Sequence, residues 1–174
     1  MSLLDYLVDS ALVLVVLQQV KERPLTARTL VRPLVLMGVA VATYLRGFPT
    51  AGRDVLLAVV LGAAGAAIGV TSGITVRLRH AGDGGVLARA GLASAAFWVL
   101  GMGARFGFIV WITHGGAGWL ERFSSQHGIT GAEAWTVALL AEATCEVVGR
   151  TAVLAARRRV CSLARSDPAA SVLV

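Results

Sequence analysis

A guanidinium lies within an apolar stretch of this sequence, and charged residues recur at helical spacing in another. The segment GMGARFGFIVWI (101–112) is apolar or glycine apart from Arg105. Glu142, Glu146 and Arg150 are spaced by four, so they form one stripe on a helix face. A charge deep in an apolar environment normally faces the interior and has a partner. Carboxylates beside a guanidinium can hold, donate or relay a proton.

Depth along each helix predicts which acid pairs with Arg105. At about 1.5 Å per residue, Arg105 lies about 5 Å outward of the midpoint of its span. Glu142 lies about 4 Å outward of the midpoint of its own span, and Glu146 lies about 2 Å inward. We therefore expect Arg105 to pair with Glu142, while Glu146 and Arg150 satisfy each other within one helix.

Two interpretations of this cluster stay open. It could be an ion-paired staple that fixes helix register, although desolvation offsets much of the attraction in a buried pair. A working site is favoured, because ionisable groups within membrane helices usually have a function. The candidate catalytic residues are then Glu142, Glu146 and Arg105, and either glutamate could be the protonated carboxyl.

Aromatic and apolar residues surround the expected cluster. Trp98, Met102, Arg105 and Ile109 share one stripe of a helix. An apolar wall with a few convergent polar groups is the usual form of a small-ligand site, here one for a lipid-soluble molecule. The candidate substrate-binding residues are Trp98, Met102, Phe106, Phe108, Tyr44 and Trp135.

The composition predicts a membrane protein. Of the 174 residues, 56% are hydrophobic and 15% are charged, whereas a soluble domain carries about a quarter charged residues. The net charge of +6 does not indicate a nucleic-acid partner, because the arginines cluster in short loops between apolar runs. Cys145 and Cys161 form no CxxC motif. We therefore expect no metal and no cofactor.

The apolar runs predict an all-α integral membrane bundle of five transmembrane helices within residues 1–160. The spans are about 3–20, 33–48, 53–76, 91–112 and 134–155. Pro33 suits the first turn of the second span. Residues 118–126 predict an interfacial helix over the outer mouth, and 161–174 a disordered cytoplasmic tail. Twelve basic residues fall on one side and three on the other, which predicts an outside N-terminus and a cytoplasmic C-terminus.

Gly65, Gly69 and Gly73 are spaced by four along the third span. Small residues on one helix face let a second backbone approach closely. The neighbour could belong to the same chain, which we favour, or to another subunit in a homo-oligomer.

Short motifs resemble small bacterial integral membrane proteins of the CcdC-like type. They are the loop RPLTAR (23–28), the Pro-led second span, the turn GFPT (47–50) and GMGAR (101–105), over about the first two thirds of the chain. The resemblance implies a multi-pass protein of the bacterial cytoplasmic membrane and little chemistry. Members have been linked to cytochrome c maturation, but this sequence has no CxxC for such work.

The overall plan is similar to that of small bacterial membrane-bound terpene cyclases, which act on isoprenoid chains with carboxylates as acids. That resemblance implies Glu142 as the acid, Arg105 as the group that holds it, and aromatic faces for a carbocation. Arg105 favours ionised carboxylates, so one glutamate can stay neutral only if Arg105 pairs with the other.

A non-enzymatic role is the alternative: a proton or ion relay, a transporter, or an assembly factor for a membrane complex. A cyclase should have a dry pocket around Glu142 that is closed toward the cytoplasm. A relay should show polar residues that continue from Glu142 through Glu146 to the inner surface.

Overall fold

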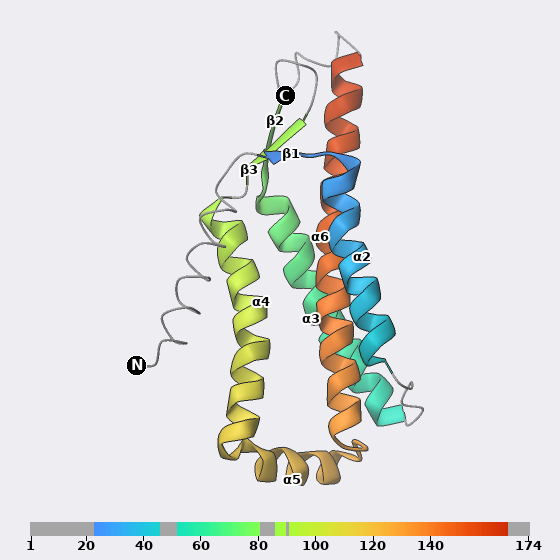
Figure 1. The fold of residues 1–174 in the computed structure, drawn as a ribbon, viewed down its shortest axis with the longest axis vertical. Coiled ribbons are helices and arrows are strands. Elements are labelled where there is room, and N and C mark those ends of the chain that lie inside the picture. The colour runs from blue at the N-terminus through green and yellow to red at the C-terminus, as the bar shows by residue number, and fades with distance from the viewer. Residues whose placement is uncertain (1–22, 46–51, 81–85, 90, 167–174) are drawn as a thin grey trace.

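The computed structural model describes residues 23–45, 52–80, 86–89 and 91–166. Its helices are α2 (Ala27–Tyr44), α3 (Gly52–Thr75), α4 (Leu92–Trp111), α5 (Ala117–His127) and α6 (Ala132–Ser166), with a π-helical turn (Ile112–Gly116) between α4 and α5. The four long helices lie along the molecule, α5 crosses one end, and a small sheet lies at the other (Figure 1). The expected first span, 3–20, lies outside the described residues.

Helices α3 and α4 occupy the ranges expected for two spans, but α2 begins six residues earlier than predicted. Thr26 caps it: the backbone N–H of Thr29 donates to the Thr26 hydroxyl at 3.4 Å, and the N–H of Thr26 donates to the Thr29 hydroxyl at 2.8 Å. These bonds satisfy backbone donors that a helix start leaves without a partner. Pro33 therefore lies inside the helix, and its predicted first-turn position was wrong.

Helix α6 is longer than the predicted span 134–155. It continues to Ser166, so residues 161–166 are helical and do not belong to a disordered tail. Arg157 joins this part of α6 to the end of α3. Its Nη1 donates to the carbonyl oxygens of Gly73, Ile74 and Val76, at 2.9, 2.8 and 2.7 Å. Carbonyls in the last turn of a helix have no partner within it, so the guanidinium satisfies them.

A small antiparallel sheet is the one described feature that the all-α prediction missed. Its strands are β1 (Arg23–Pro24), β2 (Arg77–His80) and β3 (Val86–Arg89), in the order β1-β3-β2. β2 follows α3 directly and β3 precedes α4. The sheet therefore ties the start of α2 to the connection between α3 and α4.

The closest helix packing joins α3 to α6. A Cβ added to Gly65 would overlap the backbone carbonyl of Glu142, and one added to Gly69 would overlap that of Glu146. At Gly73 the added atom would lie 3.2 Å from the carbonyl oxygen of Arg150. The glycine face therefore packs on a helix of the same chain, as favoured from the sequence.

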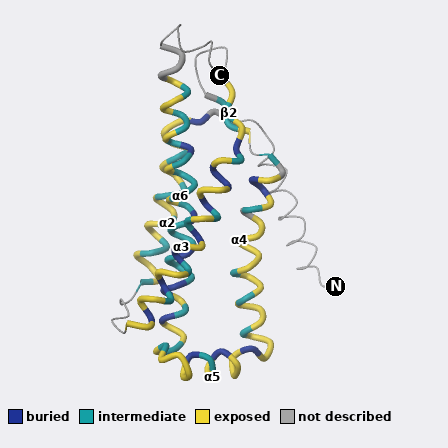
Figure 2. Tube along the Cα trace, turned by 180° about the vertical axis from the view of Figure 1, so that it is seen from behind, coloured by how far each residue is buried: buried dark blue, intermediate teal, exposed yellow. Residues whose placement is uncertain are grey.

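The bundle exposes many large apolar side chains and buries several polar ones among small apolar residues. Val35, Leu36 and Val39 on α2 are exposed, and α2 and α4 are largely exposed along their lengths (Figure 2). The buried polar side chains are those of Asp54, Ser72, Ser94, Ser124, Glu142 and Glu146. Three helical segments, Ala27–Tyr44, Gly52–Thr75 and Ala93–His127, are long and apolar enough to cross a membrane. This pattern indicates a membrane protein.

Candidate functional site

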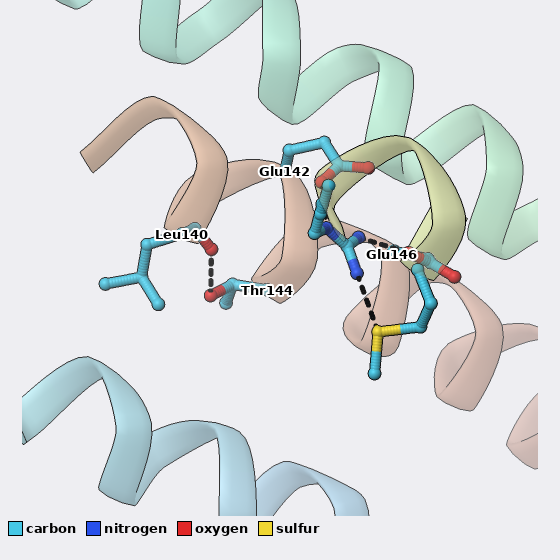
Figure 3. A network of polar contacts seen from close by, with 6 residues as sticks. Leu140, Glu142, Thr144 and Glu146 are labelled. Atoms are coloured by element: carbon cyan, nitrogen blue, oxygen red, sulfur yellow. Dashed lines mark hydrogen bonds and ion pairs between the residues drawn. The ribbon is translucent and has the colours of Figure 1, made fainter. Parts of the chain in front are cut away.

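Arg105 on α4 binds both glutamates of α6. Its Nε donates to Oε2 of Glu142, and its Nη2 donates to Oε2 of Glu146. Figure 3 shows the two carboxylates on one side of α6, reaching the same guanidinium. The third arm, Nη1, donates to Sδ of Met102 at 3.6 Å. The expected pairing of Arg105 with Glu142 is present, and Glu146 joins it.

Matched spacing on two antiparallel helices produces this contact. Glutamates four residues apart lie about one turn apart on the same face, and the planar guanidinium offers its donors as a fork that can reach both. Gly101, one turn before Arg105, lets α4 come close: a Cβ there would lie 2.9 Å from Oε2 of Glu146. A larger residue at 101 would therefore have to shift the end of the Glu146 side chain.

The expected pairing of Glu146 with Arg150 within α6 is wrong. Arg150 Nη1 instead donates to the hydroxyl of Ser72 on α3 at 2.7 Å. That hydroxyl lies 3.4 Å from the hydroxyl of Ser94 on α4, as a hydrogen bond within the fully buried part of the bundle. Both carboxylates bind Arg105, and Arg150 binds the Ser72 hydroxyl on the neighbouring helix α3.

Polar groups thus follow one another from the charged cluster toward the sheet end. Glu142, Glu146 and Arg150 lie on successive turns of α6, and Ser72 and Ser94 continue the series on α3 and α4. Closer to the sheet, Arg157 binds carbonyl oxygens at the end of α3, as described above. We call Arg105, Glu142, Glu146, Arg150, Ser72 and Ser94 the polar column.

Three of the six predicted substrate-binding residues lie near the cluster. Met102 contacts Arg105, although its side chain is 48% exposed. The ring of Phe108 lies 5.4 Å from that of Trp135, centre to centre, on the α5 side of the cluster. Trp135 Nε1 donates to the hydroxyl of Ser124 on α5 at 3.0 Å. This contact fixes the indole and ties α6 to the crossing helix.

The other predicted wall residues are not brought to the cluster. Phe106 is 66% exposed on α4. Tyr44 is also 66% exposed, at the end of α2, a helix that packs against α6 and lies away from α4 (Figure 1). The side chain of Trp98 lies outside the described part of the chain. The face of α4 that lies toward α6 therefore includes Gly101, Arg105 and Phe108. Compared with the predicted stripe, Gly101 takes the place of Met102 and Phe108 the place of Ile109.

An aromatic series joins this stripe to α5. Ring centres are 5.5 Å apart for Trp111 and Trp119, and 5.1 Å apart for Trp119 and Phe123. At the start of α3, the fully buried Asp54 accepts hydrogen bonds from the backbone N–H and the hydroxyl of Thr130. These contacts hold α5 and the following loop across the ends of α3, α4 and α6.

Sequence reasoning missed Ser72, Ser94 and Gly101. A signal existed, because Ser72 lies seven residues after Gly65 and Ser94 lies seven before Gly101. Seven residues are about two helical turns, so Ser72 shares a face with Gly65, which was named among the glycines of the third span. Ser94 likewise shares a face with Gly101, the residue before Met102. Small polar residues inside apolar spans were the observation to follow.

Within the described residues, no group of three or more His, Cys, Asp or Glu side chains could hold a metal ion. Comparison with protein-family models, with curated proteins and with solved structures finds no match to this chain.

Proposed function

We propose that this chain is a multi-pass protein of the bacterial cytoplasmic membrane whose polar column relays protons. One observation carries the proposal: polar groups continue from Glu142 and Glu146 through Arg150 to Ser72 and Ser94, toward the sheet end. A blind acid in a dry pocket does not require such a continuation. A relay needs a series of polar groups along its path, and in this proposal water bridges the one turn of α6 between Glu146 and Arg150, which no hydrogen bond joins in the described part of the chain.

In the proposed relay, the arginines and the proton-exchanging groups have different roles. A guanidinium stays protonated in proteins, so Arg105 and Arg150 balance charge and position their partners. The carboxyls of Glu142 and Glu146 and the serine hydroxyls can accept and release protons. When one of the two carboxylates binds a proton, the other still serves as the counterion of Arg105. The guanidinium therefore has an anionic partner both before and after the proton binds.

For the membrane arrangement we propose five spans, with α6 and residues 3–20 added to the three apolar helical segments. Sequence charge supports a cytoplasmic sheet end. Arg77, Arg79 and Arg89 lie on that sheet, and 157–159 is an arginine run on the nearby part of α6. Under the positive-inside rule this end faces the cytoplasm, and α5 lies at the outer interface.

Proton flux into liposomes tests the relay. The purified full chain is reconstituted with a pH-sensitive dye inside, and a potassium gradient with valinomycin drives protons. We expect flux above that of empty liposomes, and a loss of at least about tenfold in Glu142→Gln and in Glu146→Gln, as for removal of a positioned acid–base group. Glu133→Gln, at the exposed start of α6, is the matched control and should retain full flux. Unchanged flux in both cluster variants contradicts the relay.

A membrane-bound cyclase acting on an isoprenoid is the second candidate. The observation that favours it is the Phe108–Trp135 ring pair beside the cluster, since aromatic faces stabilise carbocations. The continuation of polar groups from the carboxylates to Arg150, Ser72 and Ser94 weighs against it, because an acid in a closed pocket needs no such continuation. Mass spectrometry of lipids and prenylated metabolites decides: a product that appears with the wild type and disappears with Glu142→Gln supports the cyclase.

Partners remain membrane lipids and a lipid-soluble small molecule in these proposals. A role as an assembly factor, part of the non-enzymatic alternative, needs a surface that binds another protein. The bundle can offer such a surface only within the membrane plane or at its two ends. A homo-oligomer through Gly65, Gly69 and Gly73 would have to displace α6 from that face.

A further inference from the structure

Helix α4 carries an apolar stripe that no described helix covers. Its residues follow one another at spacings of three, four and three, so they share one face of the helix: Val99, Met102, Phe106 and Ile109. All four side chains are exposed. The stripe adjoins the charged cluster, because the Met102 sulfur accepts a hydrogen bond from Arg105. This spacing is typical of a helix face that packs against a second helix.

The sheet indicates which part of the chain lies next to the start of α4. β1 and β3 are antiparallel, with Arg23 opposite Ala88 and Pro24 opposite Leu87. The chain that leads into β1 therefore comes from the side on which β3 ends. α4 begins three residues after that end, at Leu92. We therefore expect the first span, 3–20, to end beside the point where α4 begins.

The two segments match in length and in the height of their residues. Residues 3–20 as a helix would be about 27 Å long, and the 20 residues of α4 are about 30 Å long. If both helices rise equally from the sheet, Leu12 falls at the height of Val99, and Asp9 falls at the height of Met102. The first span is therefore long enough to follow the whole stripe.

Two acidic residues indicate which face of the first span turns inward. Asp5 and Asp9 share one helix face with Leu12, and an acid inside a span normally faces protein. At the heights derived above, the two acids lie on either side of Arg105. The Nη1 of Arg105 donates to the thioether sulfur of Met102, which is only a weak acceptor. The face that carries the acids therefore suits the stripe.

We propose that residues 3–20 pack antiparallel to α4 on the stripe of Val99, Met102, Phe106 and Ile109. The segment covers exposed side chains beside the charged cluster and brings two carboxyl groups to the height of the guanidinium. This inference rests on the five-span arrangement proposed above and does not depend on proton relay. A second copy of the chain on the same stripe is the alternative, and the experiment below separates the two.

Disulfide cross-linking of the full chain tests the contact. In a background of Cys145→Ser/Cys161→Ser, Leu12→Cys is combined with Val99→Cys, or with Leu100→Cys as the control. Leu100 is also exposed, but it lies about 100° around the helix from its neighbour. We expect at least about fivefold more cross-link in the Val99 pair, because cysteines whose Cα atoms are more than about 7 Å apart do not form a disulfide.

The linked product is measured by mass spectrometry after digestion with trypsin, as residues 1–21 joined to residues 90–105. Isotope-labelled and unlabelled chains are mixed before oxidation, so that links within one chain differ in mass from links between chains. Far-UV circular dichroism checks that each variant keeps the helix content of the wild type. Both test positions on α4 are exposed, so we expect the variants to fold.

Three results overturn the proposal: no link in the Val99 pair, an equal link in the Leu100 control, or links only between chains, which indicate a second copy. Reaction of Leu12→Cys with a membrane-impermeant maleimide keeps this failure apart from that of the five-span arrangement. A labelled cysteine shows that 3–20 is not a span, which overturns both proposals. An unlabelled and unlinked cysteine overturns only the packing on α4.

Discussion

Replacing Arg105 with methionine tests whether one cation holds α4 to α6. The substitution removes both of its bonds to carboxylates and leaves Glu142 and Glu146 buried, with their side chains only 11% and 9% exposed. A hydrogen bond to a charged group contributes about 1.5–3 kcal/mol. Removing one partner of a buried charge network typically costs about 3–5 kcal/mol, because the remaining charges lack a counterion. We expect Arg105→Met to lower the free energy of unfolding by about that amount.

The triple variant Arg105→Met/Glu142→Gln/Glu146→Gln provides the control. Replacing a whole buried ion network with neutral groups is often nearly neutral for stability, so the triple variant should recover most of the loss. Unfolding is followed by circular dichroism during titration with sodium dodecyl sulfate in mixed micelles. If the triple variant is as unstable as Arg105→Met, unpaired carboxylates are not the cause. The network would then contribute through packing alone.

Three further stability predictions use the same unfolding assay. Gly65→Ala should lower the free energy of unfolding by about 1–3 kcal/mol, because the added methyl group would overlap the α6 backbone. Gly107→Ala is its control: a Cβ there has nothing within 4 Å. That variant should be neutral or stabilise the protein by up to about 1 kcal/mol. Arg157→Gln should cost about 1–3 kcal/mol because carbonyls at the end of α3 lose their donor, while the exposed Arg159→Gln stays within about 0.5 kcal/mol of wild type. Trp135→Phe should lower the free energy of unfolding by at least about 0.5–1.5 kcal/mol, since it removes the bond to Ser124 and replaces the indole with a smaller aromatic ring. A loss in a control as large as in its partner variant contradicts the stated cause.

Much of the fold could be predicted from local patterns. Long apolar runs predicted α3 and α4 within a residue or so, and the alternation of apolar and polar residues predicted a helix at 118–126, where α5 lies. The predicted start of α2 was wrong because Pro33, which suits a first helical turn, lies inside the helix, and the capping pair Thr26 and Thr29 sets its actual start. The sheet was missed because its strands are only two to four residues long, although an Asp-Gly pair between two short segments is a hairpin signal.

The sequence by itself determined that Arg105 needs an acidic partner and that Glu142 and Glu146 share one helix face, because spacing along a single helix decides which residues face the same way. Only the tertiary structure decided how those charges are shared. Glycines on α3 let it lie against the α6 backbone, and Gly101 lets α4 approach the Glu146 carboxylate. The rotation and height of α4 that result put one guanidinium within reach of two carboxylates and leave Arg150 to Ser72. Spacing within one helix says nothing about the rotation of the next, and that rotation follows from packing.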